Sequence, residues 1–105
     1  MLHKIQGCFE AESALYTSHA RREMRDEPSG MIAEQQVFEA VLTAELVEDY
    51  PEDAPFPSVL LLGFTREGRP LHVVCAYDEA GSVAIVITAY QPDPERWYNL
   101  RRRKP

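Results

Sequence analysis

A single histidine lies inside an otherwise apolar segment in the second half of the chain, Gly68-Arg69-Pro70-Leu71-His72-Val73-Val74-Cys75. A buried imidazole must find a hydrogen-bond partner or line a site, and it exchanges a proton near neutral pH. His72 is therefore the first candidate for a general acid or base. Tyr90, at the end of a later apolar segment, could act beside it as a hydroxyl donor.

Charge is unevenly distributed along the chain, whose net charge is −6. Residues 34–53 contain no lysine or arginine but many acidic side chains, whereas the end of the sequence is basic. The basic residues there are Arg96, Arg101, Arg102, Arg103 and Lys104. This basic cluster could bind phosphate or an acidic partner, or it could be a solvated tail.

The elements that must position these residues follow from hydrophobic periodicity. Helices are expected over residues 2–12, over about 19–26 with Thr17 or Ser18 as cap, and after a break at 28–30 with Ser29 as cap. Strands are expected over residues 46–50, 59–64, 71–77 and 83–90. Asp93 and Pro94 could begin a short helix that carries Trp97. The predicted fold is a single α+β domain, residues 1–105, with two to three N-terminal helices on one face of a four-stranded antiparallel sheet and a short C-terminal helix or tail.

Turn lengths predict a register for the sheet. A two-residue turn at Glu67-Gly68 places Gly63 opposite His72, and a glycine bulge at Gly81 places Thr88 opposite His72 on the other side. The bulkier sheet face would then pack on the helices; its residues are Leu60, Leu62, Phe64, Leu71, Val73, Cys75, Val83, Ile85 and Ile87. His72 would lie on the other face in a shallow pocket beside Gly63, Thr88 and Tyr90.

Each candidate residue also has a purely structural interpretation. His72 could bond Thr88 across the strand pair, and His19 could orient the start of its helix. Arg22 could pair with nearby carboxylates. Tyr90 and Trp97 could be core aromatics that cover an edge of the sheet.

Several classes of function are disfavoured. The apolar segment 59–64 is too short to span a membrane, and the N-terminus does not read as a signal peptide. A cytoplasmic protein is therefore expected, with Cys8 and Cys75 reduced. No histidine pair has metal-ligand spacing, and phosphate-loop and dinucleotide fingerprints are absent, so neither a metal nor a cofactor is expected.

Four segments together resemble a family of small bacterial proteins of unknown function. They are Tyr16-Thr17-Ser18-His19-Ala20-Arg21-Arg22-Glu23-Met24, Glu48-Asp49-Tyr50-Pro51, Gly68-Arg69-Pro70-Leu71-His72-Val73-Val74 and Thr88-Ala89-Tyr90-Gln91-Pro92-Asp93-Pro94-Glu95-Arg96-Trp97. The resemblance extends from Tyr16 to Arg103. Members of this family are similar to toxins of the RelE/ParE and MqsR type, and some are encoded beside zinc-finger antitoxins. The resemblance thus implies a RelE-like fold and a bacterial toxin–antitoxin function.

By that analogy the protein would be a metal-independent endoribonuclease. Such cleavage needs a base, an acid and a cation that holds phosphate charge. His72, His19, Arg22 and Tyr90 are then the catalytic candidates, and the substrate-binding candidates are Thr88, Arg101, Arg102 and Arg103. The acidic net charge disfavours RNA as a partner, because binding to a nucleic-acid backbone depends on Lys and Arg. The alternative is a non-catalytic protein-binding module, which could be a homodimer or could bind an antitoxin-like partner.

Overall fold

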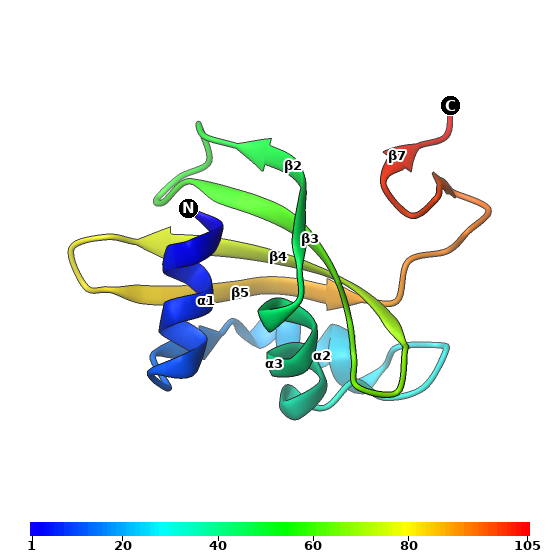
Figure 1. Ribbon diagram of the computed structural model, residues 1–105, viewed down its shortest axis with the longest axis horizontal. Coiled ribbons are helices and arrows are strands. Elements are labelled where there is room, and N and C mark those ends of the chain that lie inside the picture. Colours follow the sequence, from blue (N-terminus) through cyan, green and yellow to red (C-terminus); the bar gives the residue numbers. More distant parts are fainter.

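The computed structural model describes residues 1–105 as three helices and seven short or medium strands (Figure 1). The helices are α1 (Leu2–Glu10), α2 (Ser18–Arg25) and α3 (Glu34–Leu42). The strands are β1 (Ala14–Tyr16), β2 (Glu45–Tyr50), β3 (Ser58–Phe64), β4 (Pro70–Asp78), β5 (Val83–Tyr90), β6 (Trp97–Tyr98) and β7 (Arg102–Arg103). None of the helices is long and apolar enough to cross a membrane.

The main sheet has five strands in the order β1-β5-β4-β3-β2. Strands β2 to β5 form the expected antiparallel arrangement, but β1 adds a parallel strand beside β5, so the predicted four-stranded, wholly antiparallel sheet is wrong in this detail. Strand β1 has only three residues, too few to show the alternation that marks a strand in a sequence. Tertiary pairing with β5 creates it.

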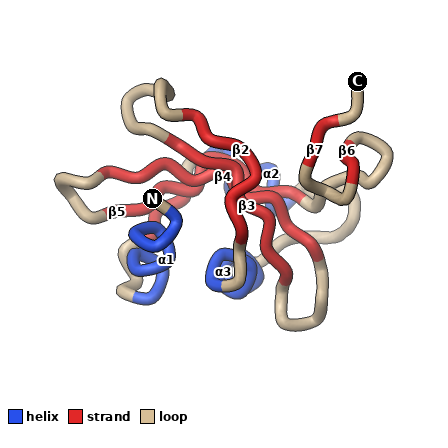
Figure 2. Tube along the Cα trace, turned by 45° about the horizontal axis from the view of Figure 1, so that its top comes forward, coloured by secondary structure: helices blue, strands red, loops and turns tan.

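The predicted C-terminal helix does not form. Asp93 starts a single turn, in which its carbonyl accepts from the Arg96 N–H and its side chain accepts from the Glu95 N–H, both at 2.9 Å. Asn99 and Leu100 then take positive φ angles of 51° and 63°, which reverses the chain. The result is the hairpin β6–β7, which Figure 2 shows set apart from the helices beside the C-terminus.

Helix starts agree only in part with the sequence prediction. Thr17 caps α2, because its hydroxyl oxygen accepts from the Ala20 N–H at 3.0 Å. Helix α3 begins later than expected, and Ser29 does not cap it. Instead the Gln36 side chain accepts from the Ala33 N–H at 2.9 Å, which satisfies a donor at the helix start.

The predicted register between β3 and β4 is wrong by one residue. His72 lies opposite Leu62, and Gly63 lies opposite Leu71. The cause is a three-residue turn rather than a two-residue turn: the Thr65 N–H bonds the Arg69 carbonyl, and Gly68 takes a positive φ of 89°. Such turns place a left-handed glycine at the third loop position.

The register between β4 and β5 also differs. His72 lies opposite Tyr90, and Thr88 lies opposite Val74. Two irregularities move Thr88 away from His72. The loop is longer than predicted, with Ser82 rather than Gly81 at positive φ, and the ladder shifts again between Val74 and Cys75.

The helices cover the sheet face that carries Leu71, Val73 and Cys75, as expected. The register correction, however, puts Val59, Leu61 and Gly63 on that face and moves Leu60 and Leu62 to the other one. The helix-side core contains the buried residues Ile5, Cys8, Phe9, Ala20, Met24, Ile32, Val37, Ala40, Val41, Val59, Leu61, Leu71, Val73, Cys75, Ala84, Val86 and Ala89.

Gly63 is the point where α3 approaches the sheet most closely. A Cβ atom at position 63 would lie 1.8 Å from the carbonyl oxygen of Ala40, a backbone atom of α3. Glycine is therefore required for packing, and Gly63 does not open a pocket beside His72 as predicted. The Thr43 hydroxyl, just after α3, also bonds the backbone of Phe64 at the end of β3.

Part of the second sheet face is buried as well. Leu60, Leu62 and His72 are each at most 1% exposed although they point away from the helix-side core. Trp97 of β6 covers His72 with its ring centroid 4.5 Å from that of the imidazole. The hairpin β6–β7 thus covers the part of this face that surrounds His72.

Candidate functional site

His72 is fully buried beneath the hairpin β6–β7, and both of its ring nitrogens have partners. Nε2 lies 2.7 Å from the Leu100 carbonyl oxygen, and Nδ1 lies 3.1 Å from the Tyr90 hydroxyl oxygen. A carbonyl oxygen only accepts, so Nε2 carries the proton and donates it. The Nδ1 of this neutral tautomer accepts from the Tyr90 O–H. Neither nitrogen is free to act on a substrate.

The surroundings of His72 keep it neutral. Burial is the largest influence and lowers its pKa below the ordinary 6.5, although the Leu100 hydrogen bond and the nearby Glu48 carboxylate act in the opposite direction. The rings of Tyr90 and Trp97 meet the imidazole edge-on, at interplanar angles of 75° and 87°. The sequence prediction that Tyr90 neighbours His72 is confirmed, but the predicted Thr88 partner is wrong.

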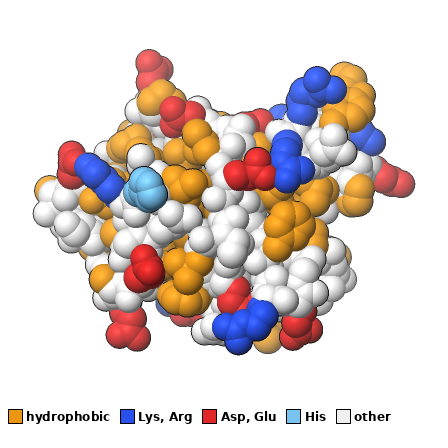
Figure 3. Space-filling view, in the orientation of Figure 1, with side chains coloured by type: hydrophobic (Ala, Val, Ile, Leu, Met, Phe, Trp, Pro, Cys, Tyr) orange, Lys and Arg blue, Asp and Glu red, His pale blue; other side chains and the backbone are white.

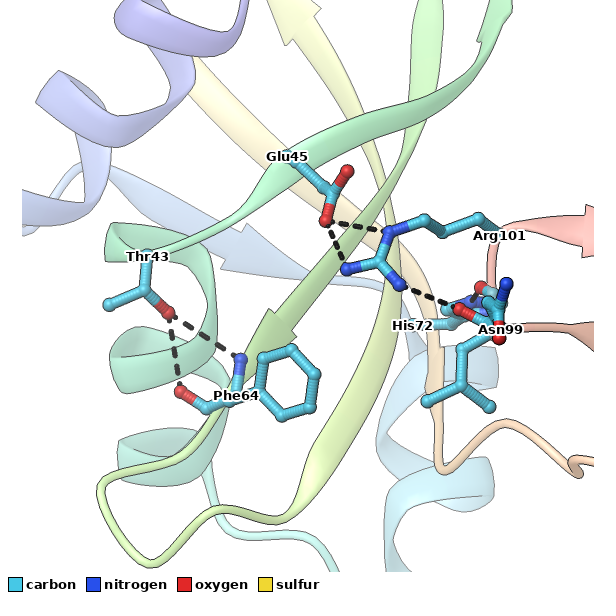
Figure 4. Close-up of polar contacts among 7 residues, drawn as sticks. Thr43, Glu45, Phe64, His72, Asn99 and Arg101 are labelled. Carbon is cyan, nitrogen blue, oxygen red and sulfur yellow. Dashed lines mark hydrogen bonds and ion pairs between the residues drawn. The ribbon is translucent and has the colours of Figure 1, made fainter.

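The basic end of the chain folds back onto the acidic strand β2. Arg101 donates to one carboxylate oxygen of Glu45 from Nε and Nη2, at 2.9 and 2.7 Å. Figure 4 shows this contact beside His72, with a third Arg101 nitrogen bonded to the Asn99 carbonyl oxygen at 2.8 Å. These bonds join the loop of the hairpin to the main sheet.

Arg103 makes a similar contact with Glu48, further along β2. Its Nε and Nη2 each lie 3.1 Å from a carboxylate oxygen of Glu48, and its guanidinium lies 4.7 Å from the centre of the Trp97 ring. The Arg103 hydrogen bond holds the pKa of Glu48 below its usual range, and Arg101 does the same for Glu45. Two predicted phosphate ligands are therefore already paired with carboxylates; Arg102 is not.

His19 and Arg22 lie on α2 near the Tyr90 side chain. Together with Tyr90 they line a hollow of about 350 Å³. His19 is mostly exposed, and its Nε2 lies 3.4 Å from a carboxylate oxygen of Glu23. Three of the four predicted catalytic residues thus share one hollow, while the fourth, His72, lies behind Tyr90 and does not reach it.

A larger cleft of about 770 Å³ adjoins this hollow. The two share Glu27, Pro28 and Tyr90. The wall of the larger cleft also includes Trp97 and Arg103, so the hairpin forms one of its sides. Tyr90 is consequently the residue that joins the buried His72 to both surface depressions.

Arg69 is a positioning residue that the sequence reasoning missed. Its guanidinium makes five hydrogen bonds, to Met31, Gln36, Ser29, Gly30 and Gln91. These bonds hold the 29–31 loop against the end of β5, next to the cleft. The only sequence signal was the position of Arg69 directly after the turn residue Gly68. That position does not indicate hydrogen-bond partners more than twenty residues away along the chain.

No group of three or more His, Cys, Asp or Glu side chains lies close enough to hold a metal ion. Cys8 and Cys75 are free and buried. Burial raises the pKa of Cys75 to about 12, so this thiol is protonated at neutral pH and packs as a small apolar side chain.

A family comparison places residues 16–91 within the domain of unknown function DUF4258. The chain belongs to this family. The description of DUF4258 states no activity and mentions no toxin. Searches of curated proteins and of solved structures found no match to the chain.

The DUF4258 match includes His19, Arg22, His72 and Tyr90 but ends before the hairpin β6–β7. It begins where the resemblance inferred from the sequence begins and ends short of Arg103. The buried His72 therefore lies within the matched residues, whereas the hairpin β6–β7 that packs over it lies outside them.

Proposed function

We propose that this DUF4258 protein is a non-catalytic module that binds another protein. The observation that carries the proposal is the environment of His72, which is fully buried with both ring nitrogens hydrogen-bonded. A general base must come within hydrogen-bond reach of the proton that it removes. His72 instead joins the sheet to the hairpin, which is the role of a structural side chain.

The distribution of charge supports the same proposal. Arg101 and Arg103, which would hold the phosphates of an RNA substrate, are engaged by Glu45 and Glu48. The net charge of −6 repels a polyanion at long range. A nucleic-acid substrate would therefore have to displace ion pairs within the protein and approach against an unfavourable field.

The test is RNA integrity and growth in cells that express the protein. We expect normal growth and intact RNA for the wild type and for His72→Gln, which keeps a donor and an acceptor without titrating. Growth arrest with RNA cleavage in the wild type would overturn the proposal, and its loss in His72→Gln while the variant remains folded would make His72 catalytic.

A second candidate function is the toxin-like ribonuclease that the family resemblance implies. It is supported by the shared hollow of His19, Arg22 and Tyr90, where a proton-exchanging group and a cation lie near one surface. Here the expected result is RNA cleavage that is lost in His19→Ala and in Arg22→Ala but kept in His72→Gln. If RNA cleavage is unaffected by His19→Ala and Arg22→Ala, this hollow is not the catalytic site.

The proposed module can act alone or as a pair of identical chains. A homodimer remains a prediction from the sequence, and light scattering of the purified protein at several concentrations measures it directly. If a dimer forms, a second copy of the chain is one partner of the module. If the protein is a monomer at all concentrations, the partner is a different protein.

A further inference from the structure

The hairpin β6–β7 separates the basic residues at the end of the chain into two sets. Trp97 pairs with Arg103 and Tyr98 pairs with Arg102. The ladder continues with a 2.9 Å bond from the Lys104 N–H to the Arg96 carbonyl. Because side chains alternate along a strand, Trp97 and Arg103 share the face that packs on the protein. The residues of the opposite face are Arg96, Tyr98, Arg102 and Lys104, here named the cationic face.

The cationic face is exposed and its charges are not neutralised. Arg102 and Lys104 are exposed and take part in no ion pair, and Arg96 has only a marginal contact with Asp93 at 4.0 Å. In Figure 3, Lys and Arg atoms gather beside apolar atoms at the upper right corner, where Figure 1 places β7. This surface therefore differs from the inward set, whose arginines bond Glu45 and Glu48.

An aromatic ring lies at the centre of the cationic face. Tyr98 is 42% exposed, with the Arg102 guanidinium 4.8 Å and the Lys104 ammonium 5.2 Å from its ring centre. These contacts orient the two cations around the ring. Tyr and Arg are enriched at the centres of protein interfaces, because they supply a large contact area together with directed hydrogen bonds.

We propose that the cationic face binds an acidic segment of a partner protein; this inference rests on the proposed function and specifies its partner. Alternate residues of an extended segment lie about 6.6–6.8 Å apart, and Arg102 and Lys104 are alternate residues at the end of the hairpin. A strand with carboxylates at alternate positions therefore suits Arg102 and Lys104 and can place an apolar or aromatic group over Tyr98.

The size and surroundings of the face favour a short acidic segment over a nucleic acid. Three cations can neutralise only about three phosphates, which gives weak and strongly salt-dependent nucleic-acid binding. A longer polyanion would also meet Asp93 and Glu95 beside the hairpin and the negative charge of the whole protein. A short segment with few carboxylates avoids this repulsion.

The experiment is an amide NMR titration of the whole protein at low ionic strength. One probe is a synthetic peptide of about six residues in which three glutamates alternate with threonine; the other is an oligouridylate of equal charge. We expect the peptide to shift the amide signals of β6–β7 and to bind about tenfold more weakly to Arg102→Gln/Lys104→Gln. The matched control, Arg25→Gln/Arg66→Gln, removes two exposed charges elsewhere and should bind like the wild type.

The Trp97 emission of each variant verifies that the hairpin stays docked. Equal peptide binding by the hairpin variant and the control, shifts located outside β6–β7, or no peptide binding at all would overturn this inference. Oligouridylate binding at β6–β7 as tight as that of the peptide would overturn it in favour of nucleic acid. None of these outcomes involves RNA cleavage in cells, so failure of the inference is distinguishable from failure of the proposed function.

Discussion

Both faces of the sheet contain buried residues, but different structures cover them. The helix-side face is covered by apolar side chains and by one backbone approach, that of Ala40 to Gly63. On the opposite face, the region around His72 is covered by a hairpin with two residues in each strand, which is held by His72, Glu45 and Glu48. Apolar burial is non-directional and cooperative, whereas each polar contact depends on its own geometry. The first face should therefore set global stability, and the second should respond to local changes.

The largest effect is expected from Gly63→Ala on the helix-side face. The new Cβ would meet a backbone oxygen that no side-chain rotation can move, so we expect a loss of about 3 kcal/mol in the free energy of unfolding. Gly7→Ala is the control: its Cβ meets nothing within 4 Å, and it should stabilise α1 by about 0.5–1 kcal/mol. Urea denaturation measures both. A tolerated Gly63→Ala would contradict the close approach of α3.

On the hairpin face, His72→Leu should have the next largest effect. It leaves the Leu100 carbonyl and the Tyr90 hydroxyl without their partner, at a cost of about 1–3 kcal/mol. We expect the hairpin to open toward water, with a red shift of the single tryptophan, Trp97, before the main sheet unfolds. Tyr90→Phe removes only the hydroxyl that bonds His72 Nδ1 and should cost about 1 kcal/mol. Unchanged emission in His72→Leu would show that the hairpin is held by other contacts.

Acid should loosen the hairpin face more than the helix-side face. The folded pKa of His72 is lowered, so its stabilising contribution is present above the unfolded pKa of about 6.5 and is lost as pH falls from there toward the folded value. Trp97 emission and unfolding midpoints between pH 8 and pH 5 test this. His72→Gln retains the carboxylates that titrate in the same direction, so the difference between the two proteins isolates the histidine. If wild type and His72→Gln lose stability in parallel as pH falls, His72 is not the group responsible.

The smallest effects are expected from the ion pairs. Glu48→Gln removes the charge that pairs with Arg103 and should cost less than about 1 kcal/mol, because the Arg103 side of the pair is open to solvent. Glu45→Gln should cost less still, since Glu45 is more exposed, with 51% of its side chain accessible against 26% for Glu48. The stability difference between wild type and Glu48→Gln should shrink as salt is raised. A large, salt-independent loss would mean that these pairs, rather than His72, hold the hairpin.

Sequence reasoning placed the three helices and four strands of the sheet, because hydrophobic period and turn residues are local signals. It failed where one residue changes the geometry. The three-residue turn at Gly68 and the irregularity after Val74 shifted both predicted registers, and a register shift of one residue exchanges the faces of a strand. The predicted pocket of Gly63 and Thr88 therefore disappeared, while Tyr90 remained beside His72.

The hairpin β6–β7 was the second failure, since Asp93 and Pro94 favour a helix start. Its strands are too short for a pattern, and the positive φ of Leu100, next to that of Asn99, is uncommon for a leucine. The ion pairs of Arg101 and Arg103 join residues that are more than fifty positions apart. The sequence contained the acidic and basic segments, but nothing in it stated that they meet.

By itself, the sequence determined that an imidazole lies in an apolar strand, that helices cover one sheet face, and that acidic and basic residues occupy separate segments. Only the tertiary structure decided what His72 does. Its partner, the Leu100 carbonyl, lies 28 residues away on a hairpin that the sequence does not mark. The physical reason is that a buried polar group needs a hydrogen-bond partner, but its burial does not determine which group that partner is. The partner is supplied by whichever segment the fold brings to that face.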